Sequence, residues 1–239
     1  MNLLKEFLLE DKCSYLDNKK QTSHYKIIEK CSATTCQDLV ERGYRRFGQM
    51  YFRPICAECN ECQSIKIEVD KFLFSKSAKR VLKKSKELSI VLQRPTISKE
   101  HLHVFDKYHK HMHEKKGWDF NPSTPEHYFN SFVNGHEDFG YEVLYFFKDK
   151  LVGVDLIDIL ADGISSIYFY YDPDFAKYSP GRLSLYKQIE FAKRYDKKWI
   201  YLGYYVEGCP SLEYKAEYKP YLTLDGRPSE YEEFHWFKK

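Results

Sequence analysis

The chain has 239 residues, of which 43% are hydrophobic, 31% charged and 17% aromatic, and its formal net charge is +3. This composition is ordinary for a globular protein, and the charge is too small to mark a nucleic-acid binder by itself. The apolar N-terminal stretch is broken by Lys5 and Glu6, and no run approaches the length of a membrane span. We therefore expect a cytoplasmic protein without membrane contact, whose seven cysteines do not form structural disulfides.

Residues 1–72 are expected to form a compact, cysteine-rich N-terminal module. Six of the seven cysteines precede residue 70, and three of them lie in one short loop, Cys56, Cys59 and Cys62. The alternating stretch at 64–69 that follows this loop predicts a strand.

Residues 73–96 are expected to connect this module to the rest of the chain. The overlapping segment 71–86 is rich in Lys and Arg and contains no acid. It predicts a basic helix, N-capped by Ser75 or Ser77, or part of an extended connector.

Residues 97–239 show the element order of one larger domain. Helical spacing and a capping Ser98 predict a helix at 98–116, and the pattern changes to period two after about residue 140. Further elements are expected as a short helix at 125–133, strands at 141–147, 151–160 and 164–172, a helix at 182–195 and a strand at 199–205.

This order resembles the GNAT-type acyltransferase fold, so we expect an α/β (α+β) protein with a GNAT-like transferase domain and a small cysteine-rich N-terminal module. In that fold a helix N-terminus faces the phosphates of the acyl carrier. The loop at 178–182 lacks the glycine-rich signature that cradles acetyl-CoA. The resemblance therefore predicts a similar scaffold with a different carrier.

Six segments carry more specific motifs: CSYL (13–16), RGYRRFG (42–48), YFRPICAECNECQSIKI (51–67), FSKSAKR (74–80), YFYYDPDFAKYSPGRLSLYKQIEFAK (168–193) and YLGYYVEGCPSLEYKAEYKP (201–220). Together they resemble the bacterial aspartate/glutamate leucyltransferases of the arginyl-tRNA–protein transferase superfamily, in family order and over most of the chain. The chain departs from that pattern at Pro180, Gln188 and Leu212, where the family commonly has Leu, Glu and Met. These changes leave the resemblance intact and the fine structure of the 178–182 loop open.

The resemblance implies transfer of leucine from leucyl-tRNA to the N-terminal Asp or Glu of an acceptor protein, which is then prone to N-end-rule degradation. The α-amine of such an acceptor has a pKa of about 7.7–8.0, and the tRNA ester is already activated. Positioning and oxyanion stabilisation therefore suffice, and we expect neither a Ser-His-Asp triad nor a cofactor required for the transfer.

The C-x-x-C-x-x-C loop supplies three thiolates, and Cys13 adds a fourth. Four thiolates suit either a tetrahedral zinc or an iron–sulfur cluster, and thiolates alone do not separate the two. The resemblance to eukaryotic transferases raises the iron–sulfur option. Free thiols in a small core remain the alternative, and we expect them at Cys31 and Cys36, which match no family cysteine.

Basic residues are the candidates for binding both substrates. An acidic N-terminal residue needs a cationic pocket, for which arginine is well suited because its fork binds carboxylates in a bidentate way. The family-like motifs supply Arg45, Arg46 and Arg53 for this role.

Phosphates of tRNA need a stripe of cations, and its terminal adenine can stack on an aromatic ring. We expect the stripe from Lys76, Lys79 and Arg80, and the stacking rings from Tyr170 and Tyr205.

Catalytic roles are expected for three residues. Asp172, at the end of a strand, is placed to orient the attacking amine, although Asp172-Pro173 also fits a plain turn. Lys215 is expected to contact a phosphate or the oxyanion, and Tyr204 ends the next strand. We expect these two strand tips to lie side by side.

Three alternatives remain at this stage. One is an arginyl instead of a leucyl donor. The second is a non-catalytic RNA-binding protein with a zinc knuckle, which leaves the sheet–loop–helix half without a role. The third, a CoA-dependent acetyltransferase, is disfavoured by the missing phosphate-loop signature.

Overall fold

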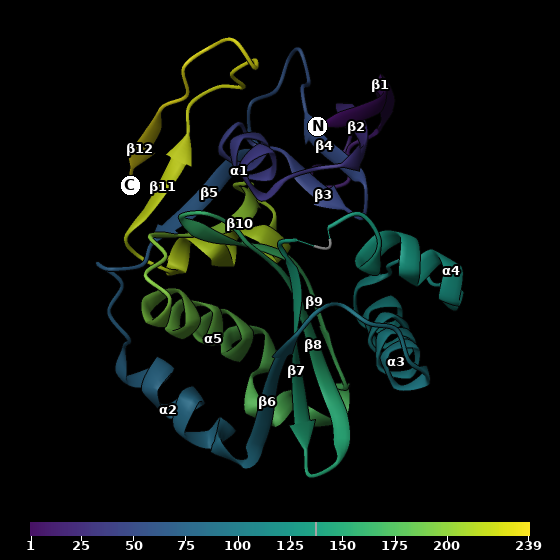
Figure 1. Ribbon diagram of the computed structural model, residues 1–239, viewed down its shortest axis with the longest axis vertical. Helices are drawn as coiled ribbons and strands as arrows, with labels where there is room; N and C mark the ends of the chain where they lie inside the picture. Colours follow the sequence, from purple (N-terminus) through teal and green to yellow (C-terminus); the bar gives the residue numbers. More distant parts are fainter. Residues whose placement is uncertain (137) are drawn as a thin grey trace.

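The computed structural model describes residues 1–136 and 138–239, which form two β-sheets with helices around them (Figure 1). The larger sheet has eight strands in the order β12-β11-β5-β10-β9-β8-β7-β6, and β9 and β10 pair in parallel. This mixed sheet confirms the expected α/β class. Its strands are β5 (Gln63–Glu68), β6 (Leu88–Gln93), β7 (Gly140–Phe147), β8 (Lys150–Ile159), β9 (Gly163–Tyr171), β10 (Trp199–Tyr205), β11 (Tyr221–Leu224) and β12 (Trp236–Lys238).

Helices cover both faces of the larger sheet (Figure 1). On one face, α5 (Pro180–Arg194) buries Leu183 and Ile189 in the main core, and α2 (Lys76–Lys84) adds Ala78. On the other face, α3 (Lys99–Lys116) buries Phe105 against β8 and β9. The remaining helical segments are α4 (Pro125–Tyr128), α6 (Pro210–Glu213), a π-helical turn at Phe129–Val133 and 3-10 turns at Ser85–Glu87, Pro173–Tyr178 and Tyr214–Glu217.

The predicted helix starts are confirmed by their caps. The Ser75 hydroxyl accepts a hydrogen bond from the N–H of Ala78, and the Ser98 hydroxyl accepts one from the N–H of His101. Pro180 occupies the first position of α5, where its missing N–H is not needed. Its replacement of a family leucine is therefore compatible with the helix.

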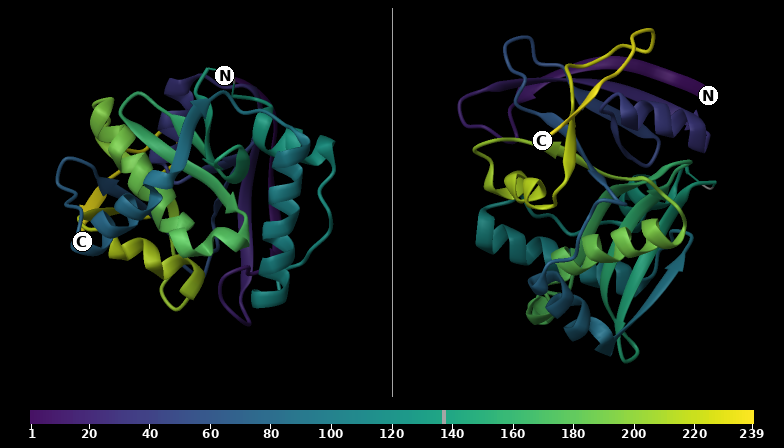
Figure 2. Two further views of the ribbon diagram at one scale, coloured as in Figure 1. Left: turned by 90° about the horizontal axis from the view of Figure 1, so that it is seen from below. Right: turned by 90° about the vertical axis from the view of Figure 1, so that its left-hand side faces the viewer.

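The smaller sheet has the order β1-β2-β4-β3 and was not anticipated by the sequence analysis. It lies with α1 (Ala33–Glu41) over one end of the larger sheet (Figures 1 and 2). A shared core joins the sheets and buries both Cys31 and Cys36, as expected for inert thiols. The strands are β1 (Asn2–Lys12), β2 (Lys20–Lys30), β3 (Arg45–Phe47) and β4 (Met50–Pro54).

The larger sheet crosses both predicted domain boundaries. Strand β5, from the proposed module 1–72, pairs with β10 and β11, and β6, from the proposed connector 73–96, pairs with β7. The division at these positions thus remains a prediction, and the shared sheet argues against separately folded modules. None of the helices in residues 1–136 and 138–239 has the length and apolar character to cross a membrane.

Candidate active site at the opening between two strands

The two central strands β9 and β10 separate part of the way along their length. Their parallel pairing covers only Trp199–Tyr201 opposite Gly163–Ser165, and β10 has an irregularity between Tyr201 and Gly203. The expectation that the ends of these strands lie side by side is therefore wrong. Separated strands leave peptide groups without a strand partner, and such groups are available to another ligand.

Arg45 of β3 inserts its guanidinium into this opening. Nη1 donates to the Leu202 carbonyl at 2.9 Å, while Nη2 donates to the carbonyls of Ser166 at 2.8 Å and Ile167 at 2.9 Å. Gly203 has a φ of +78°, and a Cβ there would lie 1.4 Å from Arg45 Nη1. Position 203 must therefore be glycine for Arg45 to hold the strands apart.

Lys215 lies at the same opening and is almost completely buried. Its Nζ donates to the Tyr204 carbonyl at 2.7 Å. Burial and the nearby Arg45 guanidinium lower the pKa of Lys215 well below its usual value. The fold therefore destabilises the charged form of this amine relative to that of an exposed lysine.

Tyr204 connects the opening to the smaller sheet. Its hydroxyl donates to the carbonyls of Gly43 and Phe52, each at 3.1 Å, and burial raises the pKa of this phenol well above its usual value. Tyr204 thus positions Lys215 through its backbone carbonyl. A catalytic role for Tyr204 remains a prediction.

Asp155 of β8 is a fully buried carboxyl group that the sequence analysis missed. Gln188 Nε2 donates to its two oxygens at 3.0 and 2.9 Å, and the Ser184 hydroxyl donates at 2.8 Å. Burial raises the pKa of Asp155 to about 7, although the hydrogen bonds from Gln188 and Ser184 oppose the shift. Gln188 also donates to the hydroxyl of Ser166, whose carbonyl binds Arg45. The sequence signal that could have identified Asp155 was an acidic residue within the apolar run 151–160.

Asp172 occupies a different position, at the turn after β9. Its carboxylate pairs with Lys107 at 2.5 Å and Lys150 at 2.7 Å and accepts the N–H of Asp174 at 3.1 Å. Burial raises the pKa of Asp172, but the bonds from Lys107 and Lys150 outweigh burial and lower it overall. Among the described residues, the contacts of Asp172 do not include Lys215. The turn that the sequence also allowed explains the position of Asp172. Its predicted role in orienting the acceptor's amine remains a prediction.

The three predicted acceptor-binding arginines are not brought into one pocket. Arg45 fills the strand opening, and Arg46 is buried in an ion pair with Asp158, with Nε 2.8 Å from Oδ2. Arg53 donates to the carbonyls of Arg42 at 2.9 Å and Pro228 at 2.8 Å. Acceptor binding by these three residues remains a prediction. The internal partners of Arg45 and Arg46 argue against it for those two, because their guanidinium groups are already occupied.

The predicted tRNA-binding residues are divided between surface and core. Lys76, Lys79 and Arg80 are exposed on α2 and have no ion-pair partner within the part of the chain that is described. Tyr170 is fully buried, with its hydroxyl 2.6 Å from that of Tyr128, whereas Tyr205 is half-buried. The cations are accessible to a phosphate backbone, but Tyr170 has no face free for a base.

The four predicted metal-ligating cysteines, Cys13, Cys56, Cys59 and Cys62, line one cavity of about 250 Å³. Burial, followed by the other three cysteines, raises the pKa of Cys62 to about 12. Thiolates are donors that a soft metal prefers, and these four border the same cavity. All four are free cysteines, and among the described residues no three ligand side chains are close enough together to hold an ion.

Known proteins resemble this chain over nearly its whole length. A family model described as "Arginine-tRNA-protein transferase, N terminus" matches residues 11–80, and its C-terminal counterpart matches residues 100–225. An "Aspartate/glutamate leucyltransferase" of Campylobacter jejuni is 47% identical over 96% of this chain and 97% of that protein. One of Helicobacter hepaticus is 43% identical over 98% and 97%. The solved structure of L-PGS from Bacillus licheniformis is more distantly similar, with a TM-score of 0.46 at 15% identity, covering 71% of this chain and 61% of that one. Given these identities over nearly its whole length, the chain belongs to the arginine-tRNA-protein transferase family and, within it, to the aspartate/glutamate leucyltransferases.

Proposed function

We propose that this protein transfers leucine from leucyl-tRNA to the N-terminal Asp or Glu of acceptor proteins in the cytoplasm, which marks those proteins for N-end-rule degradation. The names of its relatives support this donor and these acceptors. The observation that carries the proposal in the structure is the strand opening, where Arg45 and the buried Lys215 meet.

In this reaction the acceptor's α-amine attacks the ester carbonyl of leucyl-tRNA. A C–N bond forms, the bond to the ribose oxygen breaks, and one proton moves from the amine to that oxygen. Lys215, whose amine is held by Tyr204 and has a lowered pKa, is suited to relay this proton. Arg45 would keep the opening in shape and add positive charge near the developing oxyanion.

The exposed cations Lys76, Lys79 and Arg80 would contact tRNA phosphates. The four cysteines of the cavity would hold zinc or an iron–sulfur cluster, whose chemistry here would be to crosslink the cysteine loop to β1 and β2. Elemental analysis and the visible spectrum of anaerobically purified protein separate zinc, iron and free thiols. The transfer itself has no step at this site.

The test is a transfer assay with peptides that begin with Asp or Glu and with either leucyl-tRNA or arginyl-tRNA, read by mass spectrometry. A gain of one leucine residue is expected. A gain of arginine would instead assign the donor that the family model's description names. If folded protein gains neither while it still binds tRNA, the non-catalytic RNA-binding alternative replaces this proposal.

A further inference from the structure

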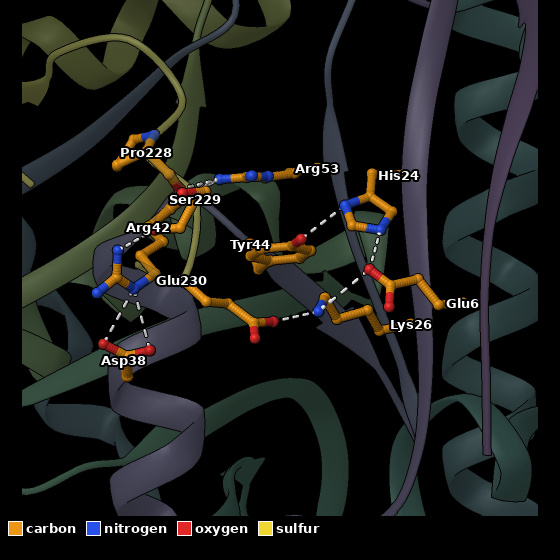
Figure 3. Close-up of polar contacts among 10 residues, drawn as sticks. All are labelled: Glu6, His24, Lys26, Asp38, Arg42, Tyr44, Arg53, Pro228, Ser229 and Glu230. Atoms are coloured by element: carbon orange, nitrogen blue, oxygen red, sulfur yellow. Dashed lines mark hydrogen bonds and ion pairs between the residues drawn. The ribbon is translucent and has the colours of Figure 1, made fainter. Parts of the chain in front are cut away.

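Three buried cations of the N-terminal half surround the ring of Tyr44 (Figure 3). Lys26 comes from β2, Arg53 from β4 and Arg42 from the residue after α1. The Arg53 guanidinium lies 4.6 Å from the ring centroid and the Lys26 amine 5.9 Å. None of the three cations is more than 9% exposed. Such a concentration of buried positive charge needs anionic or carbonyl partners.

The body of the protein supplies only part of these partners. Glu6 lies 3.3 Å from the Lys26 amine and also 2.6 Å from His24, and Asp38 lies 3.1 Å from Arg42. Both acids are substantially exposed, and neither contacts Arg53. The cluster is therefore incomplete without a further segment.

The loop between β11 and β12, residues 225–235, completes the cluster. Glu230 pairs with Lys26 through its carboxylate (Figure 3). The carbonyl of Pro228 accepts from Arg53 at 2.8 Å, and the carbonyls of Ser229 and Glu232 accept from Arg42, the latter at 2.7 Å. One acidic side chain and neighbouring backbone carbonyls are the groups that an acidic peptide presents.

The start of this loop is anchored, because Arg227 donates to the carbonyls of Cys56 at 2.9 Å and Cys59 at 2.7 Å, whereas the side chains that follow face solvent. Glu230, Tyr231, Glu232 and Glu233 are all exposed, with Tyr231 at 97%. Arg42 and loop residues 230–234 line an open pocket of about 410 Å³. Arg53 is buried, yet its Nε has no partner in the described structure, so the site offers a donor that the loop does not use. The loop begins at residue 225, where the C-terminal family match ends, whereas the three cations lie within the N-terminal match.

The cluster also adjoins the strand opening. Tyr44, Arg45 and Gly203 line one small cavity, and Tyr204 bonds to the carbonyls of Gly43 and Phe52, which precede Tyr44 and Arg53 in the chain. A peptide on the cluster would thus begin close to the opening.

We infer that Lys26, Arg42 and Arg53 form the binding site for the acidic N-terminal residue of the acceptor, and that Glu230 fills this site until an acceptor displaces the 225–235 loop. This inference rests on the proposed function and specifies its acceptor site. The acceptor's carboxylate takes the place of the Glu230 carboxylate on Lys26, and its first carbonyls replace those of Pro228 and Ser229. A competing internal group lowers apparent affinity by the fraction of molecules in which the site is free.

The first experiment measures binding by full-length protein of a peptide that begins with Glu and carries a C-terminal fluorophore, by anisotropy and without tRNA. Glu230→Gln should tighten binding by roughly 3- to 10-fold, because the neutral amide competes poorly for Lys26. Glu233→Gln removes the same charge from the same loop, but Glu233 pairs with no side chain in residues 1–136 and 138–239, so this variant should bind like the wild type. The matching peptide that begins with Gln should bind weakly to all three proteins. Equal affinity of the three proteins for the Glu peptide would overturn the inference.

The second experiment uses the wild-type protein and does not depend on how a variant folds. Hydrogen–deuterium exchange of residues 225–235 should increase at saturating Glu peptide and stay unchanged with the Gln peptide. Unchanged exchange with both peptides would mean that the loop stays bound to the cluster when the acceptor is present, and it would contradict the inference. Neither readout needs leucine transfer, so the transfer assay judges the proposed function separately.

Discussion

Arg46 lies in β3 of the smaller sheet, and Arg42 directly follows α1, four residues earlier. Both are buried, yet their partners differ in kind. Arg46 pairs with Asp158, a fully buried carboxylate of β8 in the larger sheet. Arg42 binds a half-exposed Asp38 and two carbonyls of a surface loop. The partner of Arg46 is fixed, whereas the partners of Arg42 are exchangeable, because only the partners of Arg42 lie where water or a ligand can replace them.

Arg46→Ala tests the fixed side of this comparison and should have the largest effect. Removing one partner leaves Asp158 buried and unpaired, which typically costs about 3–5 kcal/mol. Urea unfolding measures the loss in the free energy of unfolding. A loss below about 1 kcal/mol would mean that Asp158 finds water or another donor.

Asp155→Asn tests a second buried carboxylate, the one near the strand opening, by the pH dependence of stability. The folded-state pKa of about 7 lies above the unfolded value, so the native state binds the extra proton between these two values. Stability from this group is fully present below the unfolded pKa and declines as pH rises toward 7. At about 1.4 kcal/mol per pKa unit, wild-type protein should lose on the order of 2 kcal/mol more than the variant between about pH 5 and pH 7.5. Parallel pH profiles from urea unfolding would contradict this pKa shift.

Arg42→Ala tests the exchangeable side and should cost less stability, about 1 kcal/mol, because the loop carbonyls and Asp38 can turn to water. The same variant should weaken binding of the Glu peptide. The measurements are urea unfolding and anisotropy side by side with Arg46→Ala. A loss of stability as large as that of Arg46→Ala would remove the distinction between the two arginines.

Lys79→Ala on α2 should have the smallest effect on folding, within about 0.5 kcal/mol, because its side chain is exposed. If this helix contacts tRNA, the slope of log affinity for leucyl-tRNA against log salt should become shallower by about 0.7–0.9. Lys110→Ala, an exposed lysine on α3 at the other face of the sheet, is the matched control. Identical slopes for the two variants would remove α2 from the tRNA interface.

Sequence patterns predicted the strands and helices between residues 98 and 205 well, since their apolar periodicity reflects burial in one sheet. They did not reveal β1, which is exposed along nearly all of its length and so has no alternation to recognise. They also missed that β5 and β6 belong to the larger sheet, because pairing with β10 and β7 is a long-range property. Among site residues, the motifs pointed to Arg45 and Lys215, and the structure brings both to the strand opening.

The sequence by itself determined the α/β class, the family and the types of charged residue available, because composition, periodicity and motifs are local records of the chain. Only the tertiary structure decided what each charge does. Arg45, Arg46 and Arg53 look alike along the chain, but one binds strand carbonyls, one a buried carboxylate and one a surface loop. The electrostatic role of a side chain depends on its partner and on how far that partner is shielded from water, and both come from segments more than a hundred residues away.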